Sequence, residues 1–566
     1  MKRTVLITLL TFYTFINSSA QSNQPNYFRN PLDIPMQLVA NFGEIRPNHW
    51  HMGLDIRTQH RVNLPVHAAA NGYIARVSVE SGGFGQAIYI NHPNGYTTVY
   101  GHLNSFMPEL AKYIKDKQYA QQSWSISLEI PSELFPVKKG QMIALSGSTG
   151  GSEGPHLHFE IRDTKTGNNL NPLLFHFPIE DNIPPVIQHL ALYDRNISSY
   201  EQDPKLIPLN RTKGKYEWTY HGVLKTGSDK ISFAIGSVDQ LGRFGSNKGI
   251  FSASLFYDGQ KLSVFTLNNI SYDDSRYINA QVDYRYKTRG RANLQHITPL
   301  PGDHKIVYQT FNDNGIIQLQ DNNVHGIRIE VRDAYGNLST IRINIQYDAA
   351  LNKTKVPAGE KFIPNNVNIA DRNGFELYTT ENSIYDTVIT SYTTAEDHSP
   401  NSISSLHTFL DASIPVHDEI TVRIKPDDSI EQGNGQKMVI RNISGKKIDI
   451  QRAVWNRGWL SAKFRQFGSF QAIVDNEPPT VNAPGAGEVI DLSRLSRLVF
   501  VPKDNLNSIR SFRAELDGNW LRFSNDKGHS WIYNFDEHFL PGEHELKVTI
   551  EDEAGNITVK LWKVKR

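Results

Sequence analysis

Gly154-Pro155-His156-Leu157-His158-Phe159-Glu160 is the stretch that decides the interpretation of the first third of this 566-residue sequence. The preceding residues, 147–153, are rich in glycine and serine, so we expect a turn that leads abruptly into a strand. Successive side chains of a strand alternate between its two faces, which places His156 and His158 on the same side. Because neutral imidazole is a good zinc ligand, this pair is either half of a metal site or a pair of surface or hydrogen-bonded histidines.

Two upstream segments supply further candidate ligands. His51 and Asp55 lie four residues apart, and His102 ends an alternating run that begins at Thr98. The spacing of His51 and Asp55 would suit one face of a helix, but Gly53 between them speaks against a helix. We therefore expect a loop that carries His51 and leads into a strand that carries Asp55. Catalytic zinc takes three protein ligands and leaves a position to water, so two imidazoles and one carboxylate would suffice, with histidines left for proton transfer.

Together these motifs resemble those of the lysostaphin/LytM-type zinc metallopeptidases. The resemblance is carried by His-x-x-x-Asp at 51–55, Tyr-Gly-His-Leu at 100–103, Gly-Ser-Thr-Gly at 147–150 and Gly-Pro-His-Leu-His-Phe-Glu-Ile at 154–161. The intervening runs at 64–72, 83–90 and 137–144 also look like core strands of that family. The resemblance covers residues 45–178, and no motif position is degenerate.

The resemblance implies roles for five residues. His51, Asp55 and His158 would be the ligands of one zinc ion in the domain. His102 and His156 would be the catalytic histidines that do not bind the metal. The implied reaction is zinc-assisted hydrolysis of a peptide bond, in which His156 takes or positions the water proton. His102 would stabilise the developing oxyanion or pass a proton to the leaving amine, and the two histidines could exchange these roles.

The substrate implied by the resemblance is the peptide part of bacterial peptidoglycan, cut in a stem or a cross-bridge. We therefore expect an exported endopeptidase that remodels the cell wall, and two other functions stay open. Related domains that have lost ligands are catalytically silent regulators of cell-wall amidases. Alternatively, the C-terminal β-domains could make this protein a surface adhesin or scaffold with an accessory zinc domain. The five intact positions favour the enzyme, and a pull-down with residues 184–566 would reveal a protein partner of the β-domains.

The first twenty residues are typical of a secretory signal peptide. Lys2 and Arg3 precede an apolar run over residues 5–16, and small residues follow at 18–20. The run is too short to span a membrane comfortably, and a retained anchor helix is the alternative. We expect cleavage after Ala20, export to the periplasm, the cell envelope or the medium, and no transmembrane segment in the mature chain.

The composition excludes cysteine chemistry and gives no reason to expect a nucleic-acid partner. The formal net charge of +1 gives no reason to expect nucleic acid as an electrostatic partner. The sequence has no cysteine, which excludes disulfides, thiolate catalysis and cysteine metal sites. A chain of 566 residues is too long for one core, and its 10% of aromatic residues lean towards β-structure.

We therefore expect a mainly β protein that begins with a signal peptide over residues 1–20. An antiparallel β-sheet metallopeptidase domain is expected over residues 21–180. The sequence between His102 and Val137 is longer than the family outline and predicts a short helical insertion that begins at Pro108. This insertion either narrows the groove beside the site or is a surface elaboration without catalytic consequence.

The remainder predicts two or three β-sandwich domains. Two Asp-Asn-x-Pro-Pro segments, each followed by alternating strands and a Gly-Asn turn, predict two immunoglobulin-like copies, at 184–346 and 478–566. The first copy is enlarged by insertions. Residues 350–474 are rich in Thr, Ser, Ile and Val and predict a further β-domain of unclear family.

Two residues beside the motifs have open roles. His49 shares a loop with His51 and either lines the pocket or lies on the surface. Glu160 follows His158 by two residues and shares its face, so it could act as a general base. We prefer Glu160 as an outer partner that orients an imidazole, because the resemblance assigns proton transfer to histidines.

Overall fold

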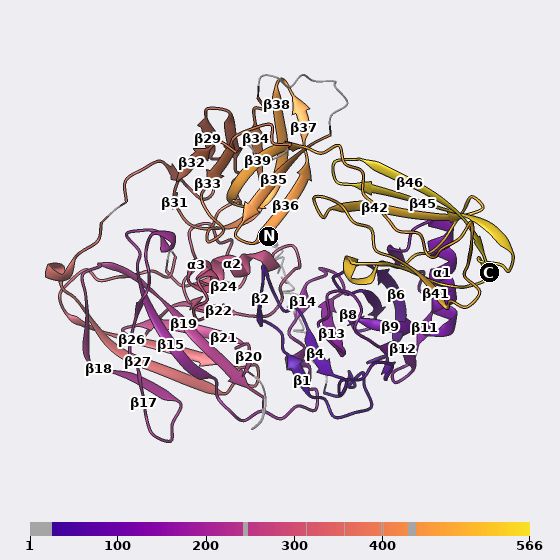
Figure 1. Ribbon diagram of the computed structural model, residues 1–566. Coiled ribbons are helices and arrows are strands. Elements are labelled where there is room, and N and C mark those ends of the chain that lie inside the picture. The colour runs from indigo at the N-terminus through magenta and orange to yellow at the C-terminus, as the bar shows by residue number, and fades with distance from the viewer. Residues whose placement is uncertain are drawn as a thin grey trace, which may run out of the picture.

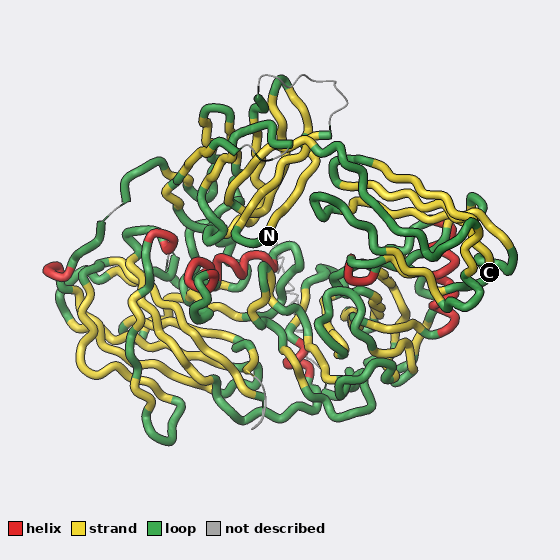
Figure 2. Tube along the Cα trace, viewed as in Figure 1, coloured by secondary structure: helices red, strands yellow, loops and turns green. Residues whose placement is uncertain are grey.

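The computed structural model describes residues 25–241, 247–312, 314–355, 357–397, 399, 401–427 and 437–566. The expected signal peptide, residues 1–20, lies outside these ranges. Strands dominate all parts of the described chain (Figures 1 and 2), which confirms the mainly β fold class. Within the described ranges, none of the helices is long and apolar enough to cross a membrane.

Residues 25–180, the first unit, form an antiparallel sheet and a smaller second sheet around one core. The main sheet contains, in spatial order, β1 (Leu38–Ala40), β4 (Leu54–Arg57), β13 (His156–Asp163), β8 (Tyr96–Gly101), β7 (Gln86–Asn91), β6 (Gly72–Val79) and β10 (Ile126–Glu129). β11 (Pro136–Val137) pairs with β6, and β14 (Asn169–Leu170) pairs with β13. The smaller sheet contains β5 (Pro65–His67), β12 (Met142–Ser146) and β9 (Leu103–Phe106), and β2 (Ile45–Arg46) forms a hairpin with β3 (His49–Trp50). Leu157, Phe159 and Ile161 of β13 lie in the core, which leaves the alternate residues of β13 for the other face.

Residues 181–348, the second unit, form two sheets that share a core. One sheet contains β16 (Lys205–Leu206), β15 (Val186–Asp194), β19 (Lys230–Gln240) and β20 (Asn247–Lys248), with β23 (Gln295–His296) and β25 (Ile317–Gln318) also paired to β19. The other contains β17 (Asn210–Arg211), β18 (Glu217–Thr226), β27 (Leu338–Tyr347), β26 (Val324–Arg332), β21 (Ser252–Tyr257), β22 (Gln260–Thr266) and β24 (Tyr308–Thr310). Two short helices, α2 (Ile278–Gln281) and α3 (Tyr284–Thr288), follow β22. Phe42, Trp50 and Met52 of the first unit are buried in this core, so the two units are firmly joined.

Residues 359–475, the third unit, and residues 478–566, the C-terminal unit, complete the chain. The third unit has two five-stranded sheets that share a core. The first contains β29 (Ile369–Arg372), β30 (Phe375–Tyr378), β34 (Pro415–Ile424), β38 (Trp459–Gln466) and β37 (Val454–Asn456). The second contains β32 (Tyr392–Ala395), β33 (Leu406–Phe409), β39 (Gly468–Val474), β35 (Met438–Ser444) and β36 (Lys447–Arg452). A two-stranded sheet, β28 (Lys361–Phe362) with β31 (Val388–Ile389), belongs to the same unit. The C-terminal unit packs β40 (Val489–Asp491), β46 (Ile557–Lys565), β45 (Glu543–Asp552), β42 (Ile509–Leu516) and β43 (Asn519–Trp520) with β41 (Arg497–Phe500) and β44 (Trp531–Asn534).

One five-stranded arrangement occurs in both the second and the C-terminal units. The order is β18-β27-β26-β21-β22 in the second unit and β40-β46-β45-β42-β43 in the C-terminal unit. In each, the first pair is parallel and the remaining pairs are antiparallel. Two copies of one domain, as the repeated sequence motifs predict, would share this strand order. The domain limits and the immunoglobulin-like assignment stay predictions.

The four units close into a ring (Figure 1). One contact at each junction illustrates this: Trp50 Nε1 donates to Gln281 Oε1 (2.7 Å), Arg276 Nε donates to the Val416 carbonyl (2.8 Å), Arg452 pairs with Glu551 (3.0 Å) and Lys115 pairs with Asp536 (2.9 Å). The last contact brings the C-terminal unit back onto the first. The site described below therefore lies in a unit that is held on two sides.

The expected helical insertion is present as α1 (Pro108–Gln121), with Pro108 in its first turn. It is one of the parts of the first unit that the C-terminal unit contacts (Figure 1). Lys115 Nζ lies 2.7 Å from Glu537 Oε2, and the Tyr119 ring stacks on His538 with centroids 3.6 Å apart. Neither sequence interpretation of the insertion anticipated this docking role.

Candidate metal centre and active site

Strand pairing places Asp55 and His158 beside each other. In the antiparallel pair β4–β13, Asp55 lies directly opposite His158, so the two side chains point to the same face of the sheet. His51 lies in the connection between β3 and β4, as expected for a loop that leads into the strand of Asp55. All three side chains are nearly buried, with residue exposures of 6% for His51, 7% for Asp55 and 5% for His158.

Three donor atoms of these residues converge on one point. His51 Nε2 lies 3.0 Å from Asp55 Oδ1 and 3.1 Å from His158 Nδ1, and His158 Nδ1 lies 2.9 Å from Asp55 Oδ1. Ligand atoms at the corners of a tetrahedral zinc site with bonds near 2.0–2.1 Å are about 3.3 Å apart. The three atoms could therefore hold one ion with only a small expansion, and they leave a fourth position open.

Hydrogen bonds fix the tautomers that such a role needs. The other ring nitrogen of His51, Nδ1, lies 2.8 Å from the carbonyl oxygen of Asn41, so it carries a proton that it donates there. His158 Nε2 lies 3.0 Å from Glu160 Oε1 and donates to it in the same way. Each ring thus turns its other nitrogen to the point of convergence, which is the usual arrangement of a metal-binding histidine. Burial opposes protonation of His158, but Asp55 and Glu160 raise its pKa to about 9, so a bound metal would displace a proton from Nδ1.

The Asp55 side chain is ionised. Burial alone would raise its pKa, but the His51, His156 and His158 rings hold the pKa of Asp55 well below its usual range. Its second oxygen, Oδ2, lies 3.5 Å from the guanidinium of Arg46. Arg46, the last residue of β2, was not singled out from the sequence as part of the site.

His156 and His102 lie next to the three donors without belonging to the closest set. His156 Nε2 is 3.4 Å from Asp55 Oδ1, while its Nδ1 donates to the carbonyl of Gly154 at 2.8 Å. His102 Nδ1 donates to the carbonyl of Thr149 at 2.8 Å, and its ring meets that of His156 edge-on with centroids 4.7 Å apart. Burial lowers the pKa of His102 to about 3, so this ring is neutral at neutral pH. The structure thus brings together all five residues that the sequence singled out.

The buried carboxylate of Glu160 accepts a hydrogen bond from the ring nitrogen of His158 that faces away from the three donor atoms. Glu160 is fully buried, and its Oε2 accepts from Arg162 Nη2 at 2.6 Å. Burial opposes ionisation of Glu160, but the charge of Arg162 and the contact with His158 lower its pKa to about 2. Glu160 is therefore a permanent carboxylate that orients the His158 ring, which matches the role preferred for it from the sequence.

The second unit contributes Tyr272 to this group. The Tyr272 hydroxyl donates to Glu160 Oε1, the same oxygen that accepts from His158. Sequence reasoning missed Tyr272, which lies more than a hundred residues beyond Glu160 in a segment without motif. A residue from outside the first unit therefore helps to hold the imidazole of His158.

Gly53 explains why the two central strands can approach each other closely. A Cβ added there would lie 2.5 Å from the carbonyl oxygen of Phe159 and 2.9 Å from His158 Nε2. These distances are far below normal contact, so any side chain at this position would displace the strand of His158. Position 53 requires glycine because the strand of His158 lies so close to it, and not because of an unusual backbone angle.

The five residues open into a groove of about 800 Å³. Its walls include His49, Phe84 and Tyr272, as well as the loop 151–155. His49 is thus both surface-exposed and part of the groove wall. The C-terminal unit contacts this loop and the residue before it: Lys527 Nζ donates to the Ser152 carbonyl at 2.6 Å, and Asp526 Oδ1 accepts from the Gly150 amide at 2.7 Å.

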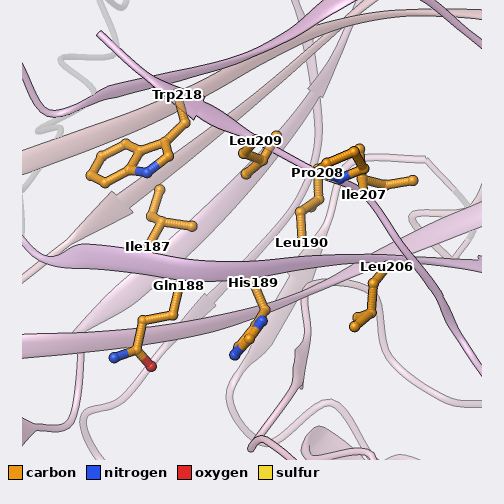
Figure 3. A pocket seen from close by; sticks show the side chains of 9 residues that line it. All are labelled: Ile187, Gln188, His189, Leu190, Leu206, Ile207, Pro208, Leu209 and Trp218. Atoms are coloured by element: carbon orange, nitrogen blue, oxygen red, sulfur yellow. The ribbon is translucent and has the colours of Figure 1, made fainter. Parts of the chain in front are cut away.

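A second cavity, of about 320 Å³, lies in the second unit beside β15 (Figure 3). Its walls are mainly aliphatic, and Figure 3 shows Ile187 pointing toward Trp218 while Gln188 and His189 point the other way. Because its lining offers a single imidazole and no carboxylate, it lacks a set of groups that could act together in catalysis. The groove at His51 is therefore the site pursued below.

Comparison with family models gives two matches. The model described as Peptidase family M23 matches residues 49–123 and 132–172, which include all five residues of the groove. The model described as Zu5-like domain matches residues 359–475. The second match covers the β-domain for which the sequence alone indicated no family.

Curated relatives are similar to the first unit. An uncharacterized metalloprotease of Haemophilus influenzae is 34% identical over 173 residues, which are 29% of this chain and 30% of that protein. The DD-carboxypeptidase/endopeptidase Mpg of Neisseria meningitidis is 34% identical over 128 residues, 23% of each chain. The lipoprotein NlpD of Yersinia enterocolitica is 32% identical over 111 residues, 20% of this chain and 88% of that sequence. The chain thus spans less than a third of the length of the first two relatives.

Among solved structures, the catalytic domain of lysostaphin from Staphylococcus simulans is similar to this chain. The two are 25% identical, and the match covers 25% of this chain and 92% of that domain with a TM-score of 0.18.

Proposed function

This chain belongs to peptidase family M23 through its first unit, and from that premise we propose that it is an exported, zinc-dependent endopeptidase that hydrolyses peptide bonds of bacterial peptidoglycan. The observation that carries the proposal is the convergence of His51 Nε2, Asp55 Oδ1 and His158 Nδ1 within 2.9–3.1 Å of one another in an open groove. Relatives named as a metalloprotease and as a DD-carboxypeptidase/endopeptidase support the reaction class, and one named peptidoglycan DD-endopeptidase ShyA, of Vibrio cholerae, supports the substrate.

In this proposal His51, Asp55 and His158 hold zinc. The donor set fits the metal, because two imidazoles in fixed tautomers and one ionised carboxylate satisfy the preference of zinc for nitrogen and oxygen ligands. Zinc, when bound, would polarise the scissile carbonyl and bring the pKa of a water molecule towards neutrality. The rest of the chemistry belongs to side chains of the protein.

Proton transfer falls to His156 and His102. Both rings are anchored by Nδ1, to the carbonyls of Gly154 and Thr149, so each presents an Nε2 that can accept a proton. His156 Nε2, the nearer to Asp55, takes the proton of the attacking water. His102, neutral at rest, is placed to hydrogen-bond the substrate oxygen or the leaving amine once a proton has reached its Nε2.

Digestion of isolated peptidoglycan by the purified chain tests the proposal. We expect newly exposed amino groups and fewer cross-linked muropeptides, identified by mass spectrometry after muramidase digestion of the treated peptidoglycan, and no such change after zinc is removed with a chelator. Activity should return when zinc is added back, which separates metal loss from irreversible unfolding. Intact peptidoglycan after incubation with zinc-loaded chain would contradict the proposal and favour the regulator of cell-wall amidases.

The support behind His158 gives a second prediction. Glu160→Gln should weaken zinc binding by about 10–100-fold, the usual effect of losing an outer partner of a metal-binding histidine. Tyr272→Phe should weaken it less, by up to about 10-fold, because Arg162 still holds Glu160. Zinc affinity measured by competition with a chromogenic chelator gives both values.

Tyr378→Phe is the matched control for Tyr272→Phe. Tyr378 donates to Glu376 at 2.6 Å in the third unit, so its loss removes a similar hydrogen bond far along the chain from the groove. We expect unchanged zinc affinity in this variant. If Tyr272→Phe lowered only the melting temperature, Tyr272 would join the two units without positioning His158.

A further inference from the structure

Two groups of three aspartates lie where the second and the C-terminal units begin. The first group is Asp181, Asp239 and Asp333, and the second is Asp475, Asp504 and Asp552. In each group, one carboxylate oxygen from each residue lies within 4.8 Å of the other two. Oxygens bound to one Ca²⁺ at 2.3–2.6 Å are at most about 5 Å apart, so either group could surround a single ion.

The linker aspartates of the two groups are held alike. Asp181 Oδ1 accepts from the amide of Ile183 at 3.0 Å, and Asp475 Oδ1 accepts from the amide of Glu477 at 3.1 Å. Both residues open an Asp-Asn-x-Pro-Pro segment, which leads from the preceding unit into the new one. Each linker thus begins with the same side-chain-to-backbone hydrogen bond.

The turn aspartates are also held alike. Asp333 accepts from the backbone amide of Asn337 at 2.9 Å and from its side chain at 2.7 Å. Asp552 accepts from the backbone and the side chain of Asn556 at 2.8 Å each. Each asparagine side chain also donates to the carbonyl of the linker aspartate, at 3.2 Å to Asp181 and 2.9 Å to Asp475. A hydrogen-bonded frame therefore surrounds both groups.

The frame leaves buried carboxylate oxygens without a partner. Among the described residues, Asp181 Oδ2, Asp239 Oδ1, Asp475 Oδ2 and Asp504 Oδ1 are buried and accept no hydrogen bond. Asp239 and Asp475 are only 1% exposed, and Asp181 is 8% exposed. An unpaired buried carboxylate oxygen is costly, and its occurrence at the same two positions of both groups is not expected by chance.

We propose that each aspartate group binds one Ca²⁺ ion. The donors are all oxygens, three carboxylates with the linker carbonyl close by, which suits a hard cation and not zinc. Mg²⁺ demands shorter bonds of about 2.0–2.1 Å in near-octahedral geometry and gives up its water reluctantly, so a group of largely buried carboxylates favours Ca²⁺. This proposal concerns residues outside the groove and does not depend on the proposed hydrolysis.

The electrostatics of the first group agree with this assignment. Burial, together with the charges of Asp181 and Asp333, raises the pKa of Asp239 to about 8. Lys248, paired opposite Asp239, opposes this shift only partly. Three carboxylates in this position therefore need a positive charge or a proton, and a divalent ion would supply the charge.

An ion in either group would brace the junction between units. Next to the first group, Ala334 packs against the core of the first unit. Next to the second, the Gly555 carbonyl accepts from Lys437 of the third unit at 2.5 Å, and Arg452 Nε donates to the Glu553 carbonyl at 3.0 Å. Because one ion would tie linker and turn together, it would fix the angle at which each unit leaves its predecessor.

Calcium titration of the zinc-loaded full chain tests the proposal. After removal of free divalent ions, isothermal titration calorimetry should report two Ca²⁺ ions per chain, with Mg²⁺ at least about 10-fold weaker, and the melting temperature should rise in millimolar Ca²⁺. Asp239→Asn and Asp504→Asn keep the size of the side chain and should each bind one ion. The double variant should bind none and lose the calcium-dependent rise in melting temperature.

Asp411→Asn is the matched control, since Asp411 is exposed and accepts from a backbone amide two residues on, as the linker aspartates do. It should bind two ions. Absence of calcium heat together with an unchanged melting temperature of the intact chain would overturn the proposal without any variant. Undiminished binding in Asp239→Asn or Asp504→Asn would overturn the assignment of the group concerned.

Discussion

Asp55→Ala is expected to abolish zinc binding and peptidoglycan hydrolysis together. Asp55 Oδ1 lies 3.0 Å from His51 Nε2 and 2.9 Å from His158 Nδ1, so the change removes the donor that both imidazoles face. Because Asp55 is the only carboxylate of the proposed ligand set, zinc affinity should fall by more than the roughly 10–100-fold typical of an outer partner. Metal analysis of the purified variant and mass spectrometry of the treated, muramidase-digested peptidoglycan measure the two effects.

The variant should remain folded, since alanine leaves no unpaired charge in the buried site and keeps the strand pairing of β4. Circular dichroism and thermal unfolding check this directly. Asp163→Ala is the control, because Asp163 lies on the same strand as His158 but accepts from Thr166 in an exposed turn. Full zinc content and normal hydrolysis in Asp55→Ala would show that the zinc is held by other residues.

The candidate site could be predicted from the sequence largely because its parts are local. Strand alternation placed His156 and His158 on one face, and Gly53 directed the interpretation of His51 towards a loop. The pairing that sets His158 opposite Asp55 joins strands about a hundred residues apart, and no local pattern encodes it. That step rested on the resemblance to a family with the same motifs.

The insertion shows how local and long-range information separate. Proline in the first turn and apolar residues at helical spacing predicted α1, because they act within a few residues of one another. The docking of Lys115 on Asp536 and of Tyr119 on His538 depends on where a separate core places the C-terminal unit. Contacts of this kind leave no periodic signal in either segment.

Tyr272 and the aspartate groups were missed for related reasons. Tyr272 reaches Glu160 only because the first two units share a buried interface around Trp50. The repeated linker and turn motifs were visible in the sequence, but the Asp-x-Leu runs at 239–241 and 504–506 were too short to be singled out. The third unit was predicted as a β-domain, and alternation alone cannot distinguish one β-family from another.

His156→Ala is expected to keep zinc and lose turnover, in contrast to Asp55→Ala. The imidazole of His156 lies 3.4 Å from Asp55 Oδ1, outside the set of 2.9–3.1 Å contacts, and its removal leaves the three donors and their hydrogen bonds to Asn41 and Glu160 in place. Loss of a general base typically costs about 10²–10⁴-fold in rate. Zinc content and initial rates on soluble muropeptides, measured on the same preparation, provide the two values.

His102→Ala extends this prediction to the second histidine. Its Nδ1 is bound to the Thr149 carbonyl, so its loss also spares the three donors, and we expect zinc to be retained with a similar loss of rate. A His156→Ala protein without zinc would contradict the assignment of roles, because His156 would then be a ligand of the metal. A His156→Ala protein with zinc and normal rates would instead leave proton transfer to His102 alone, since its ring is the other non-ligand imidazole beside the donors.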